Sequence, residues 1–209
     1  MQTLIEAWSD FHFLPAADFA DDPNLVPDHE GLYVLCFSES SGLPGRAREA
    51  TGRRTVHQDD YSVLYVGRSN SNIRARLDCH LLHTAWVSCF RKTAGLLMRD
   101  VLDLEPRPGA DGGRNWAFGY EGEAVLTEWM LSDAVIGFRM SDDPLGEERD
   151  LIERADPMLN IEGRRRTEEG RRLVALLASV RPPRVRRSPN RVGVRRLRSP
   201  QRTASGGLA

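Results

Sequence analysis

The sequence has few cysteines, no long apolar run and almost no lysine. Only three of the 209 residues are cysteine, an odd number without a Cys-x-x-Cys pair, so neither a disulfide framework nor a ribbon-type zinc site is suggested. No apolar stretch approaches the length needed to cross a bilayer, and the first residues lack the basic start of an export signal. We therefore expect a soluble cytoplasmic protein.

Lysine occurs only at Lys92 among 29 basic residues, and the remaining positive charge is unevenly distributed. Residues 1–163 hold 15 Lys and Arg against 28 Asp and Glu, a formal charge of −13, whereas residues 164–209 hold 14 against 2, a charge of +12. A cationic arm beside an acidic body often accompanies nucleic-acid binding, because it releases counterions from phosphates. A bias in coding composition would also produce such a tail, so both interpretations stay open.

The order of apolar runs and turns predicts one α+β domain, because a chain of this length can bury one sizeable core but not two. Strands are predicted over 31–37, 62–67 and 135–140, and helices from about 72 and over 90–102, 123–132 and 146–155. We expect a small three-stranded antiparallel sheet flanked by helices in a domain of residues 30–163. A lead of residues 1–29 should pack on it through aromatic side chains.

A long segment of residues 38–60 separates the first two predicted strands. It contains glycine and proline among charged residues and shows no periodicity, which predicts a surface loop inserted in a hairpin. Basic side chains make it a candidate substrate-contacting loop, although a solvated insertion explains it equally well: Arg46, Arg48, Arg53, Arg54 and His57.

The C-terminal part has a different character. Residues 164–180 include one possible helix, and residues 181–209 hold nine arginines and no acidic residue, so we expect a disordered tail. A Ser-Pro-x-Arg pattern ends at Arg191 and again at Arg202. Such units suit the narrow A/T-rich minor groove, where arginine is favoured electrostatically, but a short pattern in an arginine-rich tail also arises by chance.

The stretch with the most polar chemistry is a strand, a glycine turn and a helix. The strand ends at Gly67, and the following helix places Arg76 and His80 four residues apart, on one face. A tyrosine near the end of the strand and a guanidinium on the helix suit phosphate chemistry better than core packing, because neither polar group can be buried unpaired without cost. The pattern indicates a candidate site.

Several short motifs in a fixed order surround this stretch. They are Gly31-Leu32-Tyr33, Tyr65-Val66-Gly67, Arg76 with His80, Glu148, and Pro157-Met158-Leu159-Asn160. Each is weak alone, but together they resemble the GIY-YIG nuclease family, known from the incision subunit of bacterial excision repair and from intron homing endonucleases. The resemblance covers about residues 30–161.

The resemblance implies an endonuclease that hydrolyses DNA phosphodiester bonds with a divalent metal. Such hydrolysis needs an attacking water, charge relief on the phosphoryl oxygens and stabilisation of the leaving oxygen. By the resemblance, Tyr33 and Tyr65 would position or deprotonate the water, Arg76 would bind the scissile phosphate, and Glu148 would hold Mg²⁺ or Mn²⁺. His80 would support the tyrosine or the phosphate.

Two further residues are implied to contact the substrate. Arg68 would add positive charge at the end of the strand, and Asn160 would form a hydrogen bond near the site or fix the end of a helix. The implied partner is DNA, with no membrane and no organic cofactor.

Simpler interpretations stand beside these roles. Tyr33 could be a core residue, Arg76 and His80 an exposed helix face, and Glu148 a carboxylate that favours the start of a helix. A zinc cluster of Cys79, His80, His83 and Cys89 matches no common spacing. A non-catalytic nucleic-acid-binding module of the same fold, or an adaptor acting through its acidic surface, also fits the sequence.

The sequence departs from the family pattern in its spacing. Tyr33 and Tyr65 lie 32 positions apart instead of about ten, and the span from His80 to Glu148 holds extra helices. All five polar side chains remain, so the departures bear on substrate choice more than on chemistry. We expect these five to converge on one concave surface, and a Glu148 on the opposite face of the sheet would argue against the nuclease interpretation.

Overall fold

The structure is a computed structural model that describes residues 8–38, 40–44, 53–56, 59–108, 115–161 and 168–180. Several predictions lie outside these residues or their described side chains. They concern the basic side chains of the segment 45–58, the disorder of residues 181–209, and the substrate contacts of Arg191 and Arg202.

A five-stranded antiparallel sheet forms the centre of the fold, in the order β1-β7-β2-β4-β3. The strands are β1 (His12–Pro15), β2 (Gly31–Ser38), β3 (Arg53–Val56), β4 (Asp59–Ser69) and β7 (Ala134–Met140). The α+β class with an antiparallel sheet flanked by helices is confirmed, whereas the expected number of three strands is wrong. The additional strands are the two edges of the sheet.

Both edge strands come from segments predicted to lack strands. β1 lies in the lead and pairs with β7, and β3 lies in the inserted segment and pairs with β4. Each has four residues, one ending in Pro15 and the other beginning with two arginines. Proline and charged residues are typical of sheet edges but weaken the sequence signal of a strand.

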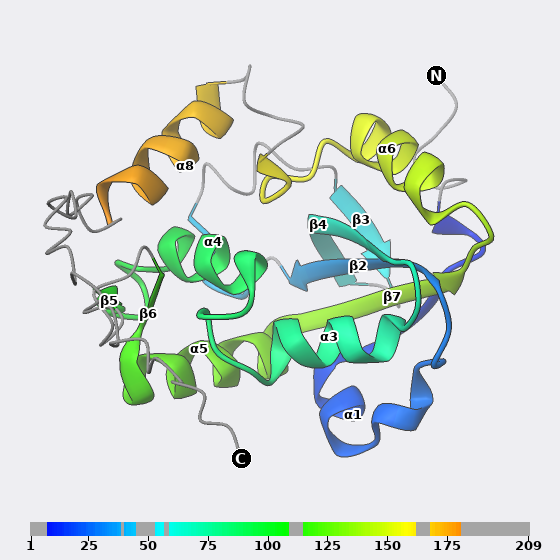
Figure 1. The fold of residues 1–209 in the computed structure, drawn as a ribbon, viewed down its shortest axis with the longest axis horizontal. Coiled ribbons are helices and arrows are strands. Elements are labelled where there is room, and N and C mark those ends of the chain that lie inside the picture. Colours follow the sequence, from blue (N-terminus) through cyan, green and yellow to red (C-terminus); the bar gives the residue numbers. More distant parts are fainter. Residues whose placement is uncertain are drawn as a thin grey trace, which may run out of the picture.

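Helices cover both faces of the sheet. α1 (Ala16–Asp21), α3 (Ile73–Leu81), α4 (Cys89–Leu97) and α5 (Gly119–Asp133) lie on one side, and α6 (Pro144–Ala155) lies on the other (Figure 1). The chain also forms a short 3-10 turn, η2 (Pro23–Leu25), and a small ribbon of β5 (Arg107–Pro108) and β6 (Trp116–Ala117). The helix predicted over 90–102 ends at Leu97, and a turn with a left-handed Asp103 follows it.

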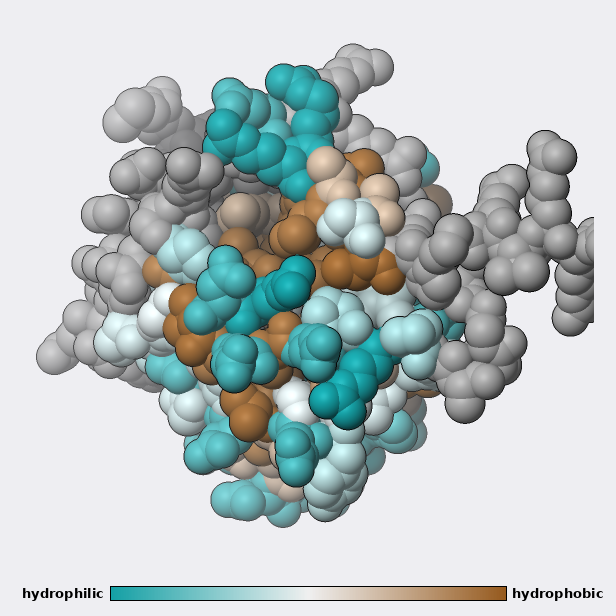
Figure 2. Space-filling model, turned by 90° about the vertical axis from the view of Figure 1, so that its left-hand side faces the viewer, coloured by the Kyte–Doolittle hydropathy of each residue, from teal (hydrophilic) through white to brown (hydrophobic). Residues whose placement is uncertain are grey.

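A further helix, α8 (Glu168–Ser179), packs beside α4. Leu173 is buried, and Leu176 and Leu177 pack against the main core, so the helix predicted within 164–180 is confirmed. Figure 2 shows the side that carries α4 and α8, where apolar side chains gather at the centre among hydrophilic ones. The apolar stripe of α8 thus helps to close this side of the core.

Two hydrophobic cores lie on the two faces of the sheet. The larger includes Phe37, Leu77 and Leu126, and the smaller includes Val34 and Leu151. β2 is buried along nearly its whole length because helices cover both of its faces. This explains why its sequence is continuously apolar instead of alternating.

A β-bulge in β4 changes which face its side chains point to. Leu35 pairs with Tyr65 but Cys36 pairs with Val63, so Leu64 is an extra residue. Leu64 and Tyr65 both pack into the larger core, while Val63 and Val66 belong to the smaller one. The bulge therefore turns Tyr65 toward the α3 side of the sheet, where Tyr33 also lies.

Candidate active site

The glycines of the two short motifs allow the strands and side chains to approach closely. Tyr33 pairs with Gly67 across β2 and β4, and a Cβ atom on Gly67 would lie 2.3 Å from Cζ of Tyr33 and 2.4 Å from its hydroxyl oxygen. Gly31 has a φ of +153°, and a Cβ atom there would lie 2.2 Å from the Arg139 carbonyl oxygen. Any larger residue would displace the Tyr33 phenol or the neighbouring strand.

A buried chain of hydrogen bonds runs from Tyr33 to α4. The Tyr33 hydroxyl lies 2.8 Å from Nε2 of His80, and Nδ1 of His80 lies 2.8 Å from Oγ of Ser88. Ser88 is the N-cap of α4, where its Oγ accepts a hydrogen bond from the Arg91 backbone N–H at 3.1 Å. Tyr33 is fully buried, and His80 and Ser88 are each 1% exposed.

Tyr65 brings the site to the surface. It is half-buried, its ring centroid is 6.2 Å from that of Tyr33 and 5.7 Å from that of His80, and it packs against Phe90 at 5.2 Å. These rings fix the position of the Tyr65 side chain, while its partial exposure leaves it open to a ligand. Tyr33, in contrast, lies behind Tyr65 and cannot meet solvent directly.

Burial and neighbouring charges set the pKa values of the two tyrosines. Burial raises the pKa of Tyr33 well above its usual value, and it also raises the pKa of Tyr65. The negative charge of Glu148 acts in the same direction on both, whereas Arg76 lowers both pKa values. A hydrogen-bonding interaction with Tyr33 further offsets the rise at Tyr65.

Arg76 and His80 have opposite relations to solvent although they share one face of α3. Arg76 is exposed, and the nearby Tyr33 and Tyr65 more than offset the effect of its partial burial, so its pKa is raised. Burial and, to a smaller extent, the charges of Arg76 and Arg91 together lower the pKa of His80 from 6.5 to about 3. His80 is therefore neutral at physiological pH, and Arg76 carries the positive charge of this helix face.

Glu148 lies in the first turns of α6, where it pairs with β4. Its Oε2 accepts a hydrogen bond from Nε of Arg68 at 2.9 Å, and its side chain is 20% exposed. The neighbouring Glu147 pairs with Arg139 of β7. Since Arg68 and Arg139 both lie opposite Leu32 in the sheet, the two ion pairs hold the start of α6 across the ends of three strands.

The convergence of the five side chains on one concave surface stays a prediction, but their helices lie on different sides of the sheet. α6 packs against the smaller core, on the opposite side of the sheet from Tyr33. Its Glu148 carboxylate nevertheless lies close enough for its charge to raise the pKa of Tyr33 and Tyr65, and Arg76 lowers the pKa of Glu148 in return. The five side chains form one electrostatically coupled group that reaches around the end of β4, where Gly67 has no side chain.

The surroundings of Glu148 fit one hydrated divalent cation. Burial raises the pKa of Glu148 despite the neighbouring Arg68, so a cation would favour its charged form. Its second oxygen has no protein partner among the described residues. A single, partly exposed carboxylate suits Mg²⁺, which keeps most of its water ligands and binds phosphate oxygens.

The zinc alternative finds no support in the described ranges. No group of three or more His, Cys, Asp or Glu side chains suited to a metal ion occurs there. His80 is engaged with Tyr33 and Ser88, and His83 pairs with Asp78 at 2.7 Å.

Asn160 holds the end of the domain onto β4. Its Oδ1 accepts a hydrogen bond from the Val66 N–H at 2.8 Å, and its Nδ2 donates to the Val66 carbonyl at 2.7 Å. The Leu159 N–H donates to the carbonyl of Leu64 at 2.8 Å. This amide is committed to the backbone between Tyr65 and Gly67, which fits a positioning role, and a substrate contact of Asn160 stays a prediction.

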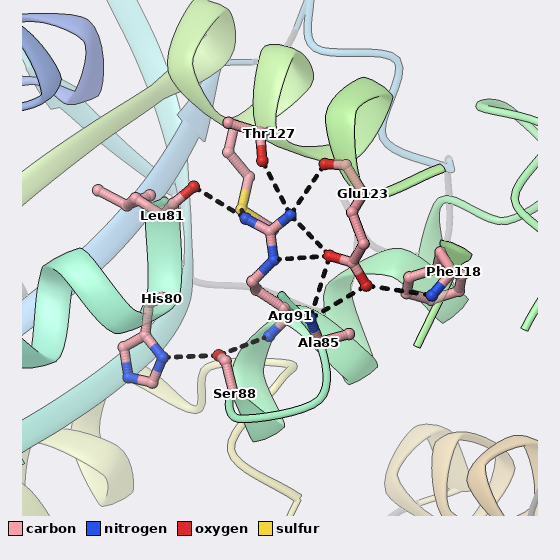
Figure 3. Close-up of polar contacts among 9 residues, drawn as sticks. His80, Leu81, Ala85, Ser88, Arg91, Phe118, Glu123 and Thr127 are labelled. Carbon is pink, nitrogen blue, oxygen red and sulfur yellow. Dashed lines mark hydrogen bonds and ion pairs between the residues drawn. The ribbon is translucent and has the colours of Figure 1, made fainter. Parts of the chain in front are cut away.

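A buried ion pair between α4 and α5 supports the site from behind, and the sequence analysis missed it. Nη2 of Arg91 donates to Oε2 of Glu123 at 2.9 Å, and both side chains are almost completely buried (Figure 3). The remaining polar atoms are paired with the backbone of Leu81, Ala85 and Phe118 and with Thr127. Because Arg91 also bonds to Ser88 through its backbone, the pair is joined to the His80 chain.

An apolar groove borders the buried ion pair, since Glu123 and Thr127 are among its lining residues. It has a volume of about 920 Å³ and is lined by residues including Leu82, Trp86, Tyr120 and Leu131, but by none of the five predicted site residues. No helix in the part of the chain that the structure describes is both long enough and apolar enough to span a membrane.

The arrangement defines a class of site that suits phosphoryl chemistry. An exposed guanidinium, a partly exposed phenol and a single carboxylate can bind a phosphate, orient a water and hold a hydrated cation. The sequence model of the GIY-YIG catalytic domain matches residues 31–181, which is most of the chain, so the protein belongs to the GIY-YIG family. No curated protein and no solved structure matches it significantly. The family supports a nuclease-type function.

Proposed function

We propose that the protein is a Mg²⁺-dependent endonuclease that hydrolyses phosphodiester bonds of DNA. The observation that carries this proposal is the electrostatic coupling of Tyr33, Tyr65, Arg76 and Glu148 around the end of β4. These residues belong to the ordered motifs of the sequence, and phosphodiester cleavage requires polar groups of these kinds.

The exposed and partly exposed residues have different roles at the phosphate. Arg76 binds the scissile phosphate and offsets the charge that develops on its oxygens, since it is the exposed cation beside the tyrosines. Tyr65 orients the attacking water, because it is accessible while Tyr33 is fully buried. After it has released its own proton to solvent, its phenolate oxygen takes the proton of that water. Glu148 holds the cation, which when bound supplies positive charge to the phosphate oxygens.

The inner residues keep Tyr65 and Arg76 in place. Tyr33 lies between His80, Tyr65 and Arg76, and its contact with Gly67 fixes the phenol against the sheet. Arg68 holds one oxygen of Glu148 and so orients the carboxylate. This differs from the sequence-based roles, in which both tyrosines contacted the water and Arg68 the substrate.

Nicking of supercoiled plasmid tests the proposal. Purified protein with Mg²⁺ should nick the plasmid, and Glu148→Gln and Arg76→Ala should each lower the rate about 100-fold or more. Two exposed or partly exposed residues serve as matched controls, Glu153→Gln on the helix of Glu148 and Arg74→Ala on the helix of Arg76. Equal nicking by the wild type and both site variants would exclude this site as the source of cleavage.

A non-catalytic DNA-binding module is the competing hypothesis. The ion pair between Arg68 and Glu148 favours it, because it already occupies one carboxylate oxygen without a metal. This hypothesis predicts retention of DNA without Mg²⁺ and no nicking under any condition. The plasmid assay, run together with a binding assay in a chelator, separates the two.

A further inference from the structure

The hydrogen-bonding capacity of Ser88 restricts the state of His80. Ser88 Oγ is within hydrogen-bond distance of two groups, the Arg91 backbone N–H, which donates to it at 3.1 Å, and Nδ1 of His80 at 2.8 Å. Among the described residues no other acceptor lies within reach of the Ser88 hydroxyl, and Ser88 is 1% exposed. Its proton therefore has one available acceptor, Nδ1 of His80.

The opposite arrangement would leave a buried donor unpaired. If His80 carried its proton on Nδ1, that proton would point at Ser88, and the serine O–H would have no acceptor within the described chain. A buried unpaired donor is costly, so the arrangement in which Ser88 donates is favoured. A neutral imidazole that accepts at Nδ1 must carry its proton on Nε2, where it faces the Tyr33 oxygen 2.8 Å away.

We propose that Ser88 is a positioning residue that fixes His80 as the Nε2–H tautomer and thereby directs the Tyr33 proton outward to Tyr65. In this order Ser88 donates to His80, His80 donates to Tyr33, and Tyr33 donates to Tyr65, which is partly exposed. A side-chain hydrogen bond joins Tyr33 and Tyr65, and the Arg76 guanidinium, which can only donate, also hydrogen-bonds to the Tyr33 oxygen. With His80 and Arg76 both donating to Tyr33, its own proton is directed to Tyr65.

The direction of these hydrogen bonds affects how well Tyr65 can act as the base. This step rests on the proposed nuclease function. A Tyr65 oxygen that accepts a hydrogen bond from Tyr33 is better able to hold the negative charge left when it gives up its own proton. If His80 had the other tautomer, Tyr33 would donate inward to Nε2, and Tyr65 would lose this support. Ser88 thus acts on Tyr65 through two intervening side chains and without touching the substrate.

The test combines the tautomer of His80 with the rate of cleavage, using the full chain. Nitrogen-15 NMR of histidine-labelled protein, with His80 assigned by comparison with His80→Gln, should show the Nε2–H tautomer in the wild type. Ser88→Asp keeps an N-cap acceptor for α4 but cannot donate to His80, so it should move the proton to Nδ1 and slow nicking about tenfold. Ser88→Thr keeps the hydroxyl, so it should preserve both the Nε2–H tautomer of His80 and the rate of nicking.

Thr93→Val is the matched control, because Thr93 carries a buried hydroxyl on α4 that, within the described residues, hydrogen-bonds to two backbone carbonyls of its own helix. It should change neither the tautomer nor the rate. An Nδ1–H tautomer in the wild type, or nicking by Ser88→Asp at the wild-type rate, would overturn the proposal. If no form of the protein nicks DNA, the proposed function fails, while the NMR result still decides the tautomer.

Discussion

At the scale of single residues, Gly67 shows why the second short motif ends in glycine. A Cβ atom at this position would overlap the Tyr33 ring and hydroxyl, so the absence of a side chain is what leaves room for the buried phenol beside β4. Sequence reasoning could place this glycine at a turn, but only the paired strands show that it makes room for a particular tyrosine.

Gly67→Ala should therefore displace the Tyr33 phenol. The added methyl would lie 2.3 Å from Cζ, so the ring must move, and we expect cleavage to fall about 100-fold because small displacements at a reacting centre are costly. A double-mutant cycle of plasmid-nicking rates with Tyr33→Phe measures how far the effect of Gly67→Ala depends on the Tyr33 hydroxyl. If Gly67→Ala costs as much in the Tyr33→Phe background as alone, the effect does not pass through the Tyr33 hydroxyl.

His80 makes the stability of the fold depend on pH. Its folded pKa is about 3, below the ordinary value of 6.5, so between these values the unfolded chain binds a proton that the folded chain excludes. Its contribution is complete above pH 6.5 and declines as the pH falls toward 3, by about 1.4 kcal/mol for each pH unit. Urea unfolding at about pH 7.5 and about pH 5.5 should show this loss.

The comparison for His80 is His80→Gln, which cannot titrate. Its free energy of unfolding should change less than that of the wild type over the same pH interval. An equal change in both proteins would show that other groups cause the pH dependence.

At the scale of secondary structure elements, the position of Tyr65 depends on a bulge and on the segment that closes the domain. The extra Leu64 turns Tyr65 toward Tyr33, and Asn160 binds both backbone groups of Val66, the next residue. The sequence shows strands and helices of the right kind, because their apolar runs are long. It does not show the bulge, since one extra apolar residue in an apolar strand leaves no signal.

The same limit applies to the supporting residues of the site. Tyr33, Tyr65, Arg76 and Glu148 could be found because they belong to ordered motifs. Ser88 could have been suggested as an N-cap before an amphipathic helix, but its contact with His80 depends on the packing of α3 against α4. Arg91 and Glu123 lie 32 positions apart and follow no motif, so their pairing required the structure.

Removal of the Asn160 amide should loosen the closing segment from β4. Asn160→Ala leaves the N–H and carbonyl of Val66 without their partner, and we expect a loss of about 2 kcal/mol or more in the free energy of unfolding. Urea unfolding measures it. Asn24→Ala, at an exposed asparagine, is the control and should cost less than about 0.5 kcal/mol. Similar losses in both variants would contradict the special role of Asn160.

At the scale of the whole molecule, the negative charge of most of the chain is unfavourable for binding DNA, the proposed substrate. Residues 1–163 carry a formal charge of −13, and residues 164–209 carry +12. A nuclease with an acidic body must overcome repulsion from DNA phosphates, and the basic segment is the part of the chain suited to do so. DNA affinity and cleavage chemistry should then depend on different parts of the sequence.

Replacement of the nine arginines of residues 181–209 by glutamine should separate these contributions. We expect weaker DNA binding, a shallower dependence of affinity on salt concentration and an unchanged kcat at saturating DNA, because fewer counterions are released. Binding isotherms at several salt concentrations and plasmid nicking at low salt measure this. An unchanged salt dependence would show that the affinity comes from another region.

The buried pair of Arg91 and Glu123 has a consequence for attempts to engineer a smaller nuclease from this chain. The region between His80 and Glu148 is longer than the short members of the family require, which makes it an obvious target for trimming. Deletion of α4 would remove Arg91 and the hydrogen bond of its backbone to Ser88, and deletion of α5 would remove Glu123 together with Leu126 and Met130 of the core. Even the replacement of Glu123 alone would leave Arg91 buried without its partner, at a cost of about 3 to 5 kcal/mol. The added helices α4 and α5 thus support the site residues structurally. A shortened protein without them would need new core residues in their place.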